Sequence, residues 1–176
     1  MQIEVRPGKL YFLKGKEGGR AIELVAGLRT ARYRVLVVSS RATGAVKDDM
    51  DVPINSILTL TESVGANSMD PQNLMVLTDT MTKFIEHGGP SVLLIENLGL
   101  LKQKNEFPKV LQMIGYIYES VAMNRAIGLV VIDPQAWDDK ELAFLGKEGS
   151  MVEEKDRLEL RSLQSRNLQN HPTQNL

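Results

Sequence analysis

Residues 9–25, KLYFLKGKEGGRAIELV, place an apolar run, a glycine-containing loop and a helical apolar pattern directly after one another. This order predicts a β-strand that leads through a turn into an α-helix. Such loops suit phosphate, because glycine lets successive backbone N–H groups curve around phosphate oxygens while the helix N-terminus adds positive potential. The segment therefore predicts an α/β fold and marks its first loop as the candidate ligand site.

The loop departs from the phosphate-loop motif GxxxxGK[ST] at the positions that carry chemistry. In that motif the lysine reaches the outer phosphates and the hydroxyl binds magnesium. Here the loop is one residue short, with Arg20 in the lysine position and Ala21 in the hydroxyl position, and Glu17 adds a carboxylate beside the expected phosphates. Glycine also serves strand-to-helix turns for steric reasons alone. The candidate phosphate-binding residues are Lys14, Gly15, Lys16, Gly18, Gly19 and Arg20.

Four further β-branched apolar runs alternate with helical patterns along the chain. They cover residues 34–40, 56–61, 91–96 and 127–133. This alternation predicts a three-layer α/β/α fold with a mainly parallel central sheet of about five strands. The runs at 34–40, 91–96 and 127–133 are nearly continuously apolar, so we expect them at the centre of the sheet.

The clearest helical pattern begins at Asp70 and Pro71, which suit a helix cap and a first turn, and ends at His87 before two glycines. We therefore interpret His87 as a helix-end residue rather than a ligand. A second strong pattern follows Pro108, and weaker ones cover 20–31 and 138–147, the last with Asp138 as its cap.

The chain has the size and composition of one domain. It has 176 residues, of which 43% are hydrophobic and 24% charged. Beyond Gly149 the sequence becomes charged and then rich in Asn and Gln. We expect a domain over residues 1–148 and a tail over 149–176 that is partly helical or disordered, although its spaced leucines could also dock on a partner.

Composition excludes several kinds of chemistry. The absence of cysteine rules out disulfides and thiolate metal sites, and no run of about 20 apolar residues predicts a membrane span. We expect a cytoplasmic protein. Asp48, Asp49 and Asp51 form an acidic cluster that could bind a cation, but an acidic surface loop is the commoner explanation. We predict neither a metal site nor a cofactor.

Positive charge is concentrated near the start of the chain. Residues 1–47 carry ten Lys and Arg against three acidic residues, whereas the remainder carries eleven against nineteen. This pattern fits a patch for anions or nucleic acid, but it also fits pairing with the acidic remainder in the folded protein. Nucleic-acid binding ranks lowest, because Tyr11, Phe12 and Tyr33 fall where we expect packing in strands or helices.

Polar residues follow the strands expected at the centre of the sheet. Ser40 and Arg41 close one run, and Glu96 and Asp133 end two others. Ligands of α/β proteins usually bind at the carboxyl ends of strands. Active phosphate-loop enzymes use a carboxylate like Glu96 near magnesium, but such a residue can also cap a turn or pair with a basic loop. These four residues complete the candidate site.

Several blocks of sequence carry a resemblance to a known family. They are residues 11–15, 35–41, 95–98 (IENL), 105–107, 131–136 (VIDPQA) and 139–145 (DKELAFL). On these blocks the chain resembles the archaeal family called domain of unknown function 835, over roughly residues 8–148. That family resembles a degenerate relative of the RecA and KaiC ATPases, occurs alone or attached to signalling domains, and has no assigned activity.

The resemblance implies a RecA-like scaffold without catalysis. Enzymes of the RecA and KaiC type carry a catalytic glutamate just after the second strand, where this chain has Ser39, Ser40 and Arg41. The Walker A lysine and the metal-binding hydroxyl are also missing, so we expect no ATP hydrolysis. The expected function is a non-catalytic interaction or regulatory module that binds a protein partner or self-associates. The alternative is binding of a nucleotide or another phosphate ligand without hydrolysis.

Overall fold

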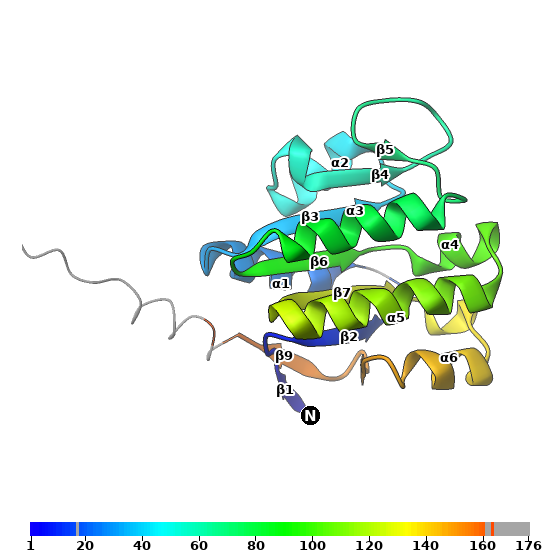
Figure 1. Cartoon of the computed structure of the whole chain (residues 1–176). Helices are drawn as coiled ribbons and strands as arrows, with labels where there is room; N and C mark the ends of the chain where they lie inside the picture. Colours follow the sequence, from blue (N-terminus) through cyan, green and yellow to red (C-terminus); the bar gives the residue numbers. More distant parts are fainter. Residues whose placement is uncertain (17, 161–162, 164–176) are drawn as a thin grey trace, which may run out of the picture.

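The computed structural model describes residues 1–16, 18–160 and 163. A central β-sheet lies between two layers of helices (Figure 1). The sheet has seven strands in the order β5-β4-β3-β6-β7-β2-β8, and every neighbouring pair is parallel. The expectation of a three-layer α/β fold with a mainly parallel sheet is confirmed, with seven strands instead of about five.

The strand bounds follow the apolar runs of the sequence. They are β2 (Lys9–Lys14), β3 (Arg34–Ser39), β4 (Ile57–Leu60), β5 (Ser68–Met69), β6 (Ser91–Ile95), β7 (Ile127–Ile132) and β8 (Ser150–Val152). Each of β3, β6 and β7 ends one residue before the predicted end, where a polar residue leaves the ladder. The middle strand is β6, flanked by β3 and β7, as the continuous apolar runs predicted.

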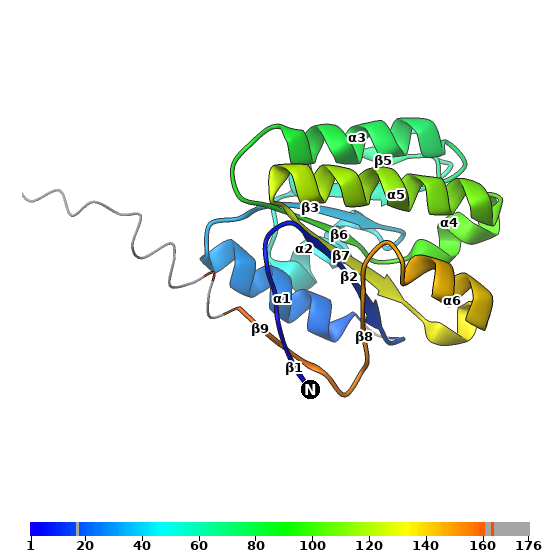
Figure 2. The same ribbon diagram turned by 60° about the horizontal axis from the view of Figure 1, so that its bottom comes forward.

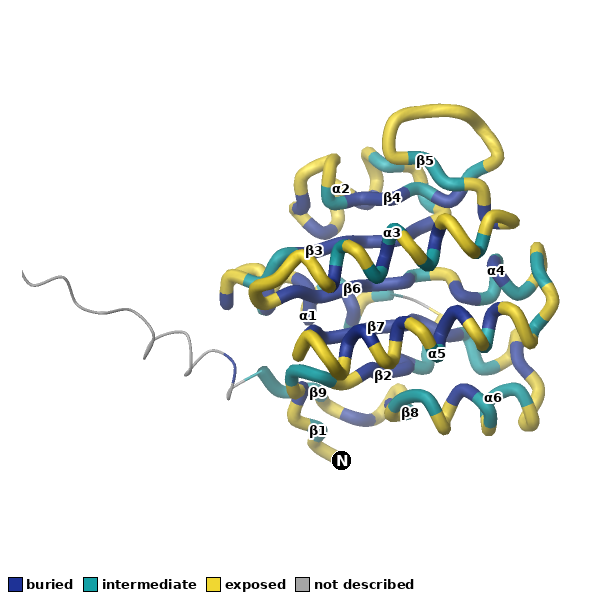
Figure 3. The backbone as a smooth tube through the Cα atoms, viewed as in Figure 1, coloured by how far each residue is buried: buried dark blue, intermediate teal, exposed yellow. Residues whose placement is uncertain are grey.

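Helices cover both faces of the sheet. They are α1 (Gly19–Thr30), α2 (Thr43–Met50), α3 (Leu74–Glu86), α4 (Leu98–Lys104), α5 (Phe107–Asn124) and α6 (Asp139–Leu145), with short 3-10 turns η1 (Ile54–Ser56) and η2 (Pro134–Ala136). One apolar core lies under α3, α4, α5 and α6, and a second lies under α1 and α2 (Figure 2). The inner strands β2, β3, β4, β6 and β7 are almost wholly buried, whereas the long helices bury a single stripe (Figure 3).

The helix starts confirm one predicted cap and correct another. Asp138 caps α6 in a reciprocal arrangement with Glu141. Helix α3 begins at Leu74 rather than at Asp70, and its cap is Asn73, whose side chain accepts a hydrogen bond from the backbone of Val76 at 3.4 Å. Asp70 instead accepts one from Gln72 N at 2.8 Å and closes a turn before the helix.

The predicted acidic loop is a helix, and that prediction was wrong. Asp48 and Asp49 lie on α2, and Asp51 follows it in the left-handed conformation, with φ of 51°. The helix forms because Val46 and Met50, one turn apart, are both buried against the sheet. Among the described residues no group of three or more His, Asp or Glu side chains could hold a metal ion.

Part of the predicted tail belongs to the folded domain. Strand β8 pairs with β2 at the edge of the main sheet, and β9 (Arg157–Glu159) pairs with β1 (Gln2–Glu4) in a separate two-stranded sheet. Strands of three residues are too short to show a period of two, so the sequence pattern missed them. The prediction for residues 161–162 and 164–176 lies outside the described part of the chain. No described helix is long and apolar enough to cross a membrane.

Candidate functional site

A cavity of about 380 Å³ lies at the carboxyl edge of the sheet. Its walls come from the glycine loop after β2 and from the segments after β3, β6 and β7. They include Gly15, Lys16, Gly18, Ser39, Ser40, Arg41, Glu96, Asn97, Asp133 and Trp137. Parallel strands bring these segments together, because their carboxyl ends share one edge.

A second cavity, of about 580 Å³, lies on the other side of the glycine loop. Lys14, Gly19 and Arg20 line it, and Lys16 and Asp133 line both cavities. Each of the ten candidate residues named from the sequence therefore lines at least one of the two cavities. Glu17, which the sequence placed beside the expected phosphates, lies outside the described residues.

Glu96 and Arg41 form a two-pronged ion pair at the centre of this edge. Arg41 Nη2 donates to Glu96 Oε1 at 2.7 Å, and Arg41 Nε donates to Glu96 Oε2 at 3.1 Å. Ser39 Oγ donates to the same Oε2. The Glu96 side chain is only 10% exposed. Paired hydrogen bonds of this kind are among the strongest that side chains make, and they fix both partners in orientation.

The guanidinium of Arg41 is held from a second side by Asp49. Its Nη1 forms an ion pair with the Asp49 carboxylate on α2. The hydrogen bonds with Glu96, and then that with Asp49, raise the pKa of Arg41 above its already high ordinary value. Arg41 is therefore a permanent cation at the edge of the sheet.

This pair changes what the strand-end carboxylate can do. A magnesium ion needs lone pairs on carboxylate oxygens, and both oxygens of Glu96 already accept hydrogen bonds from Arg41. The loop runs close above the pair, because a Cβ placed on Gly18 would lie 3.7 Å from Glu96 Oε1. The charge of the guanidinium, held against both carboxylate oxygens, disfavours a metal ion at Glu96.

Arg20, in the position of the phosphate-loop lysine, is bound to backbone carbonyls. Its Nη2 donates to Lys14 O at 2.6 Å, and its Nη1 donates to Glu153 O at 2.7 Å and Asp156 O at 3.4 Å. These bonds join the start of α1 to the turn between β8 and β9. Arg20 therefore connects two parts of the fold.

The other loop positions divide between structural contacts and exposure. Lys14 Nζ lies 2.7 Å from Glu153 Oε1. Ala21, in the hydroxyl position, is buried in the core under α1. Lys16 is exposed and makes no hydrogen bond or ion pair with the described residues. Helix α1 begins after Gly18 with no side-chain cap, so its first N–H groups face the loop.

Ser40 and Asp133 make local contacts at the ends of their strands. Ser40 Oγ accepts a hydrogen bond from Asn97 Nδ2 at 3.2 Å, and Asn97 caps α4. Asp133 accepts one from Gln135 N at 3.0 Å and so begins η2. Both side chains organise the turns that form the rim of the cavity.

Three residues that bind the predicted site residues were not identified from the sequence. Ser39 and Asp49 bind the Glu96–Arg41 pair, and Glu153 binds Lys14 and Arg20. Recognition of α2 as a helix would have placed Asp49 two turns from its start, close to Arg41. No local signal marks Glu153, which is 139 residues away from Lys14.

The turn that receives Arg20 is itself held by a buried carboxylate. Asp156 Oδ2 accepts a hydrogen bond from Glu153 N at 3.0 Å, and Asp156 Oδ1 lies 3.3 Å from the amino group of Met1. The backbone hydrogen bond from Glu153, followed by the nearby amino group, lowers the pKa of Asp156. The ionised carboxylate thus maintains the shape of the turn.

Part of the positive charge of the first 47 residues is compensated by ion pairs. Lys14 pairs with Glu153, Arg29 with Asp51, and Arg41 with two carboxylates. Arg34 lies over the ring of Phe84, at 4.7 Å from its centroid. These contacts favour the interpretation in which the early positive charge is compensated within the fold.

Solved structures share this architecture. The flagellar accessory protein FlaH from Methanocaldococcus jannaschii matches with a TM-score of 0.59 and 14% identity, over 85% of this chain and 72% of that one. The PH0250 protein from Pyrococcus horikoshii OT3 matches with a TM-score of 0.52 and 12% identity, over 84% and 82%. At such identities the likeness concerns the fold alone, and it supports the α/β fold with a mainly parallel sheet that was expected from the sequence.

The model of a known protein family also matches the chain. The model of the family described as "Protein of unknown function (DUF835)" matches residues 15–148, which is more than half of the chain. No curated protein matches the sequence. The matched region runs from the glycine loop to the end of α6 and therefore contains the whole of the cavity at Glu96.

Proposed function

The chain belongs to the DUF835 family, and from that premise we propose that it is a non-catalytic interaction or regulatory module. Its scaffold is of the degenerate ATPase type. It acts through protein contacts, with another protein or with a second copy of itself. The fold positions binding surfaces and does not turn over nucleotide.

The ion pair between Glu96 and Arg41 carries this proposal. Hydrolysis in phosphate-loop enzymes requires a carboxylate near magnesium, a lysine on the outer phosphates and a residue that activates water. Here the carboxylate is bound by Arg41 through two hydrogen bonds. The cation in the lysine position, Arg20, is directed at backbone carbonyls, and Ala21 offers no metal ligand. The end of β3 carries Ser39, Ser40 and Arg41, so no glutamate stands there to activate water. Each of the three requirements therefore lacks its usual residue at this edge of the sheet.

The test is nucleotide turnover by the purified chain with magnesium and ATP. We expect phosphate release no faster than in buffer, and no change on Glu96→Gln or Arg20→Ala. A folded state for each variant is confirmed by circular dichroism. Substantial hydrolysis that either substitution abolishes would refute the non-catalytic proposal.

A second candidate function rests on Lys16 and the uncapped start of α1. The loop places Lys16, which makes no ion pair within the described part of the chain, and backbone N–H groups between two cavities of about 380 and 580 Å³. Such a site suits a phosphate group without requiring a metal. The ligand would be a nucleotide or another phosphate-bearing small molecule, bound without hydrolysis.

Calorimetry separates this candidate from the first. ATP, ADP, cyclic nucleotides and short nucleic acids are titrated into the protein and into a Lys16→Ala variant. Phosphate binding through the loop predicts an affinity that falls in the variant, whereas Lys140→Ala on the exposed face of α6 leaves it unchanged. Absence of binding at millimolar ligand removes the candidate.

A further inference from the structure

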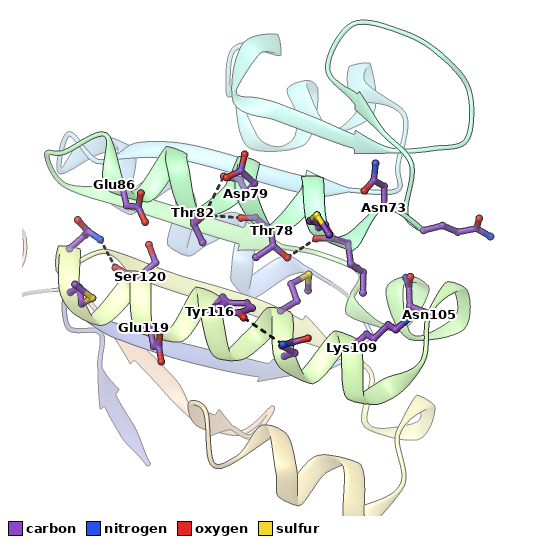
Figure 4. A pocket seen from close by; sticks show the side chains of 17 residues that line it. Asn73, Thr78, Asp79, Thr82, Glu86, Asn105, Lys109, Tyr116, Glu119 and Ser120 are labelled. Carbon is purple, nitrogen blue, oxygen red and sulfur yellow. Dashed lines mark hydrogen bonds between the residues drawn. The ribbon is translucent and has the colours of Figure 1, made fainter.

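A long groove runs between α3 and α5 on the face of the molecule away from α1 and α2 (Figures 1 and 4). Its volume is about 920 Å³. Residues of α3 line one wall over its whole length, and residues of α5 line the other. The two helices run in the same direction, with Lys109 and Asn105 at one end of the groove and Glu86 and Glu119 at the other (Figure 4).

Large apolar side chains stand out of this groove into solvent. Met75 and Met123 are each 83% exposed, at opposite ends, and Tyr116 is 52% exposed between them. Large exposed apolar groups gathered along one groove of a folded domain are typical of an interaction surface. Methionine suits such surfaces, because its unbranched side chain adapts to the shape of a partner.

Two threonines of the groove wall formed by α3 are already bonded within their own helix. Thr78 Oγ1 donates to Leu74 O at 2.6 Å, and Thr82 Oγ1 donates to Thr78 O at 3.0 Å. Their hydroxyls therefore offer little to a polar ligand. The groove suits an apolar helix face better than a sugar or a nucleotide.

The two halves of α5 carry opposite charges. Lys109 lies near the start of the helix and Glu119 lies ten residues later, and neither forms an ion pair with a described residue. Glu86, on α3, adds a second carboxylate at the Glu119 end. A surface with this pattern is complementary to itself when a second copy is turned end to end.

Gly115 lies at the middle of the same helix. A Cβ at this position would meet no atom within 4 Å, so the fold of the single chain does not require glycine there. Glycine is, apart from proline, the least favourable residue inside a helix. Its presence beside the exposed Tyr116 ridge permits the backbone of another helix to approach closely.

From these features we propose that two copies of this chain associate through α5, antiparallel, across a two-fold axis near Ile114 and Gly115. Lys109 lies five residues before Ile114 and Glu119 five after it, so the axis places each opposite the other in the second copy. Gln112 and Tyr116 are related in the same way. The proposal rests on the proposed function as an interaction module and names the partner.

The charge pattern selects the antiparallel arrangement over the parallel one. A two-fold axis along the helices would lay α5 of one copy over α3 of the other, with equivalent ends together. Glu119 would then face Glu86 of the second copy at the same end of the groove. Like charges in contact disfavour that arrangement, whereas the antiparallel one pairs opposite charges twice.

The available face implies a reversible dimer. Helix α5 has 18 residues and is about 27 Å long, and two packed helices are about 20 Å wide. The resulting face is about 500 Å² per copy, less than the roughly 800 Å² of a standard interface. We therefore expect a dissociation constant in the micromolar range.

Sedimentation velocity over a concentration series tests the proposal. We expect a monomer–dimer equilibrium whose dissociation constant rises at least about tenfold in Lys109→Glu and in Glu119→Lys, since each creates two like-charge contacts. A mixture of the two variants, and the double variant in one chain, should restore dimers, because each re-forms both pairs. Lys140→Glu, on the exposed face of α6, is the matched control and leaves dimerisation unchanged.

A further variant separates interface from folding. Gly115→Gln should raise the denaturation temperature of the monomer, because glutamine favours the helix, and should weaken the dimer, because its side chain blocks close approach. A dimer unaffected by any of these substitutions uses another face and overturns the proposal. A wild-type chain that stays monomeric up to about 1 mM also overturns it, as does a groove that binds only a helix of another protein. Those results leave the non-catalytic function intact, since that function is tested separately by ATP turnover.

Discussion

Removal of the Arg41 side chain should destabilise the protein by about 2 kcal/mol. In Arg41→Ala the carboxylate of Glu96, which is 10% exposed, keeps only the hydrogen bond from Ser39. Loss of one partner of a buried pair costs about 3–5 kcal/mol. Arg41 itself is 38% exposed, so water reaches the pair and we reduce that figure to about 2 kcal/mol.

The assays are urea denaturation and thermal denaturation, both followed by circular dichroism. For a domain of this size a loss of about 2 kcal/mol corresponds to a fall in Tm of about 4–8 °C. The free energy of unfolding is measured for Arg41→Ala, Glu96→Gln and the double variant. In the Glu96→Gln background the Arg41 substitution should cost less, because no buried charge is left without its partner.

Two outcomes would refute the reasoning about this pair. One is a loss of less than about 0.5 kcal/mol in Arg41→Ala, which is the size of an ordinary surface substitution. The other is an equal loss with and without the Glu96 carboxylate, which would assign the effect to packing rather than to the ion pair. Lys140→Ala, exposed on α6, serves as the control and should change stability by less than about 0.5 kcal/mol.

The remaining predictions concern the loop, the turn after β8 and the start of α3. Arg20→Ala should lower the free energy of unfolding by about 1–2 kcal/mol, because three carbonyls lose a charged donor. Lys16→Ala should change that free energy by less than about 0.5 kcal/mol. Equal effects of the two substitutions in urea denaturation would contradict the bonding role of Arg20. The fold lowers the pKa of Asp156 below its ordinary 3.8, so its ionised form stabilises the protein above that pH and the contribution is lost as pH falls through the lowered pKa. Asp156→Asn should therefore be less stable than wild type at neutral pH, and a difference that stays constant in urea titrations down to about pH 3 would contradict this. Asn73→Ala should reduce stability by about 1 kcal/mol as the loss of a helix cap, and by more than Asp70→Ala; the reverse order in thermal denaturation would place the cap at Asp70.

Much of the architecture could be predicted because its signals are local. A continuous apolar run marks a strand covered on both faces, and this placed β3, β6 and β7 at the centre of the sheet. The same runs end in polar residues, so the edge that holds Glu96 and Asp133 followed from the sequence. The capping pair at Asp138 was equally visible, because Glu141 lies three residues away.

Short elements and helix starts were less predictable. Two residues before α3, Asp70 and Asn73, could each cap the helix. The cap is Asn73, because the apolar stripe that the helix buries starts at Leu74. Strands β8 and β9 have three residues each and exist because β2 and β1 offer them edges. Neither the start of α3 nor the presence of β8 and β9 is marked by a pattern within a few residues of the sequence.

The sequence by itself determined the scaffold and the residue types at the carboxyl edge of its sheet. These are an arginine where a lysine would stand, an alanine in place of a hydroxyl, and no glutamate after the second predicted strand. Only the tertiary structure decided what the remaining charges do. Arg41 meets Glu96 across 55 residues, and Arg20 meets the carbonyl of Glu153 across 133. A strand or helix is specified by neighbours along the chain, whereas an ion pair depends on which ends the folded sheet brings together. Residues 9–25 therefore predicted an absence of hydrolytic chemistry, and the fold showed that Lys14 and Arg20 from this segment bind the turn between β8 and β9.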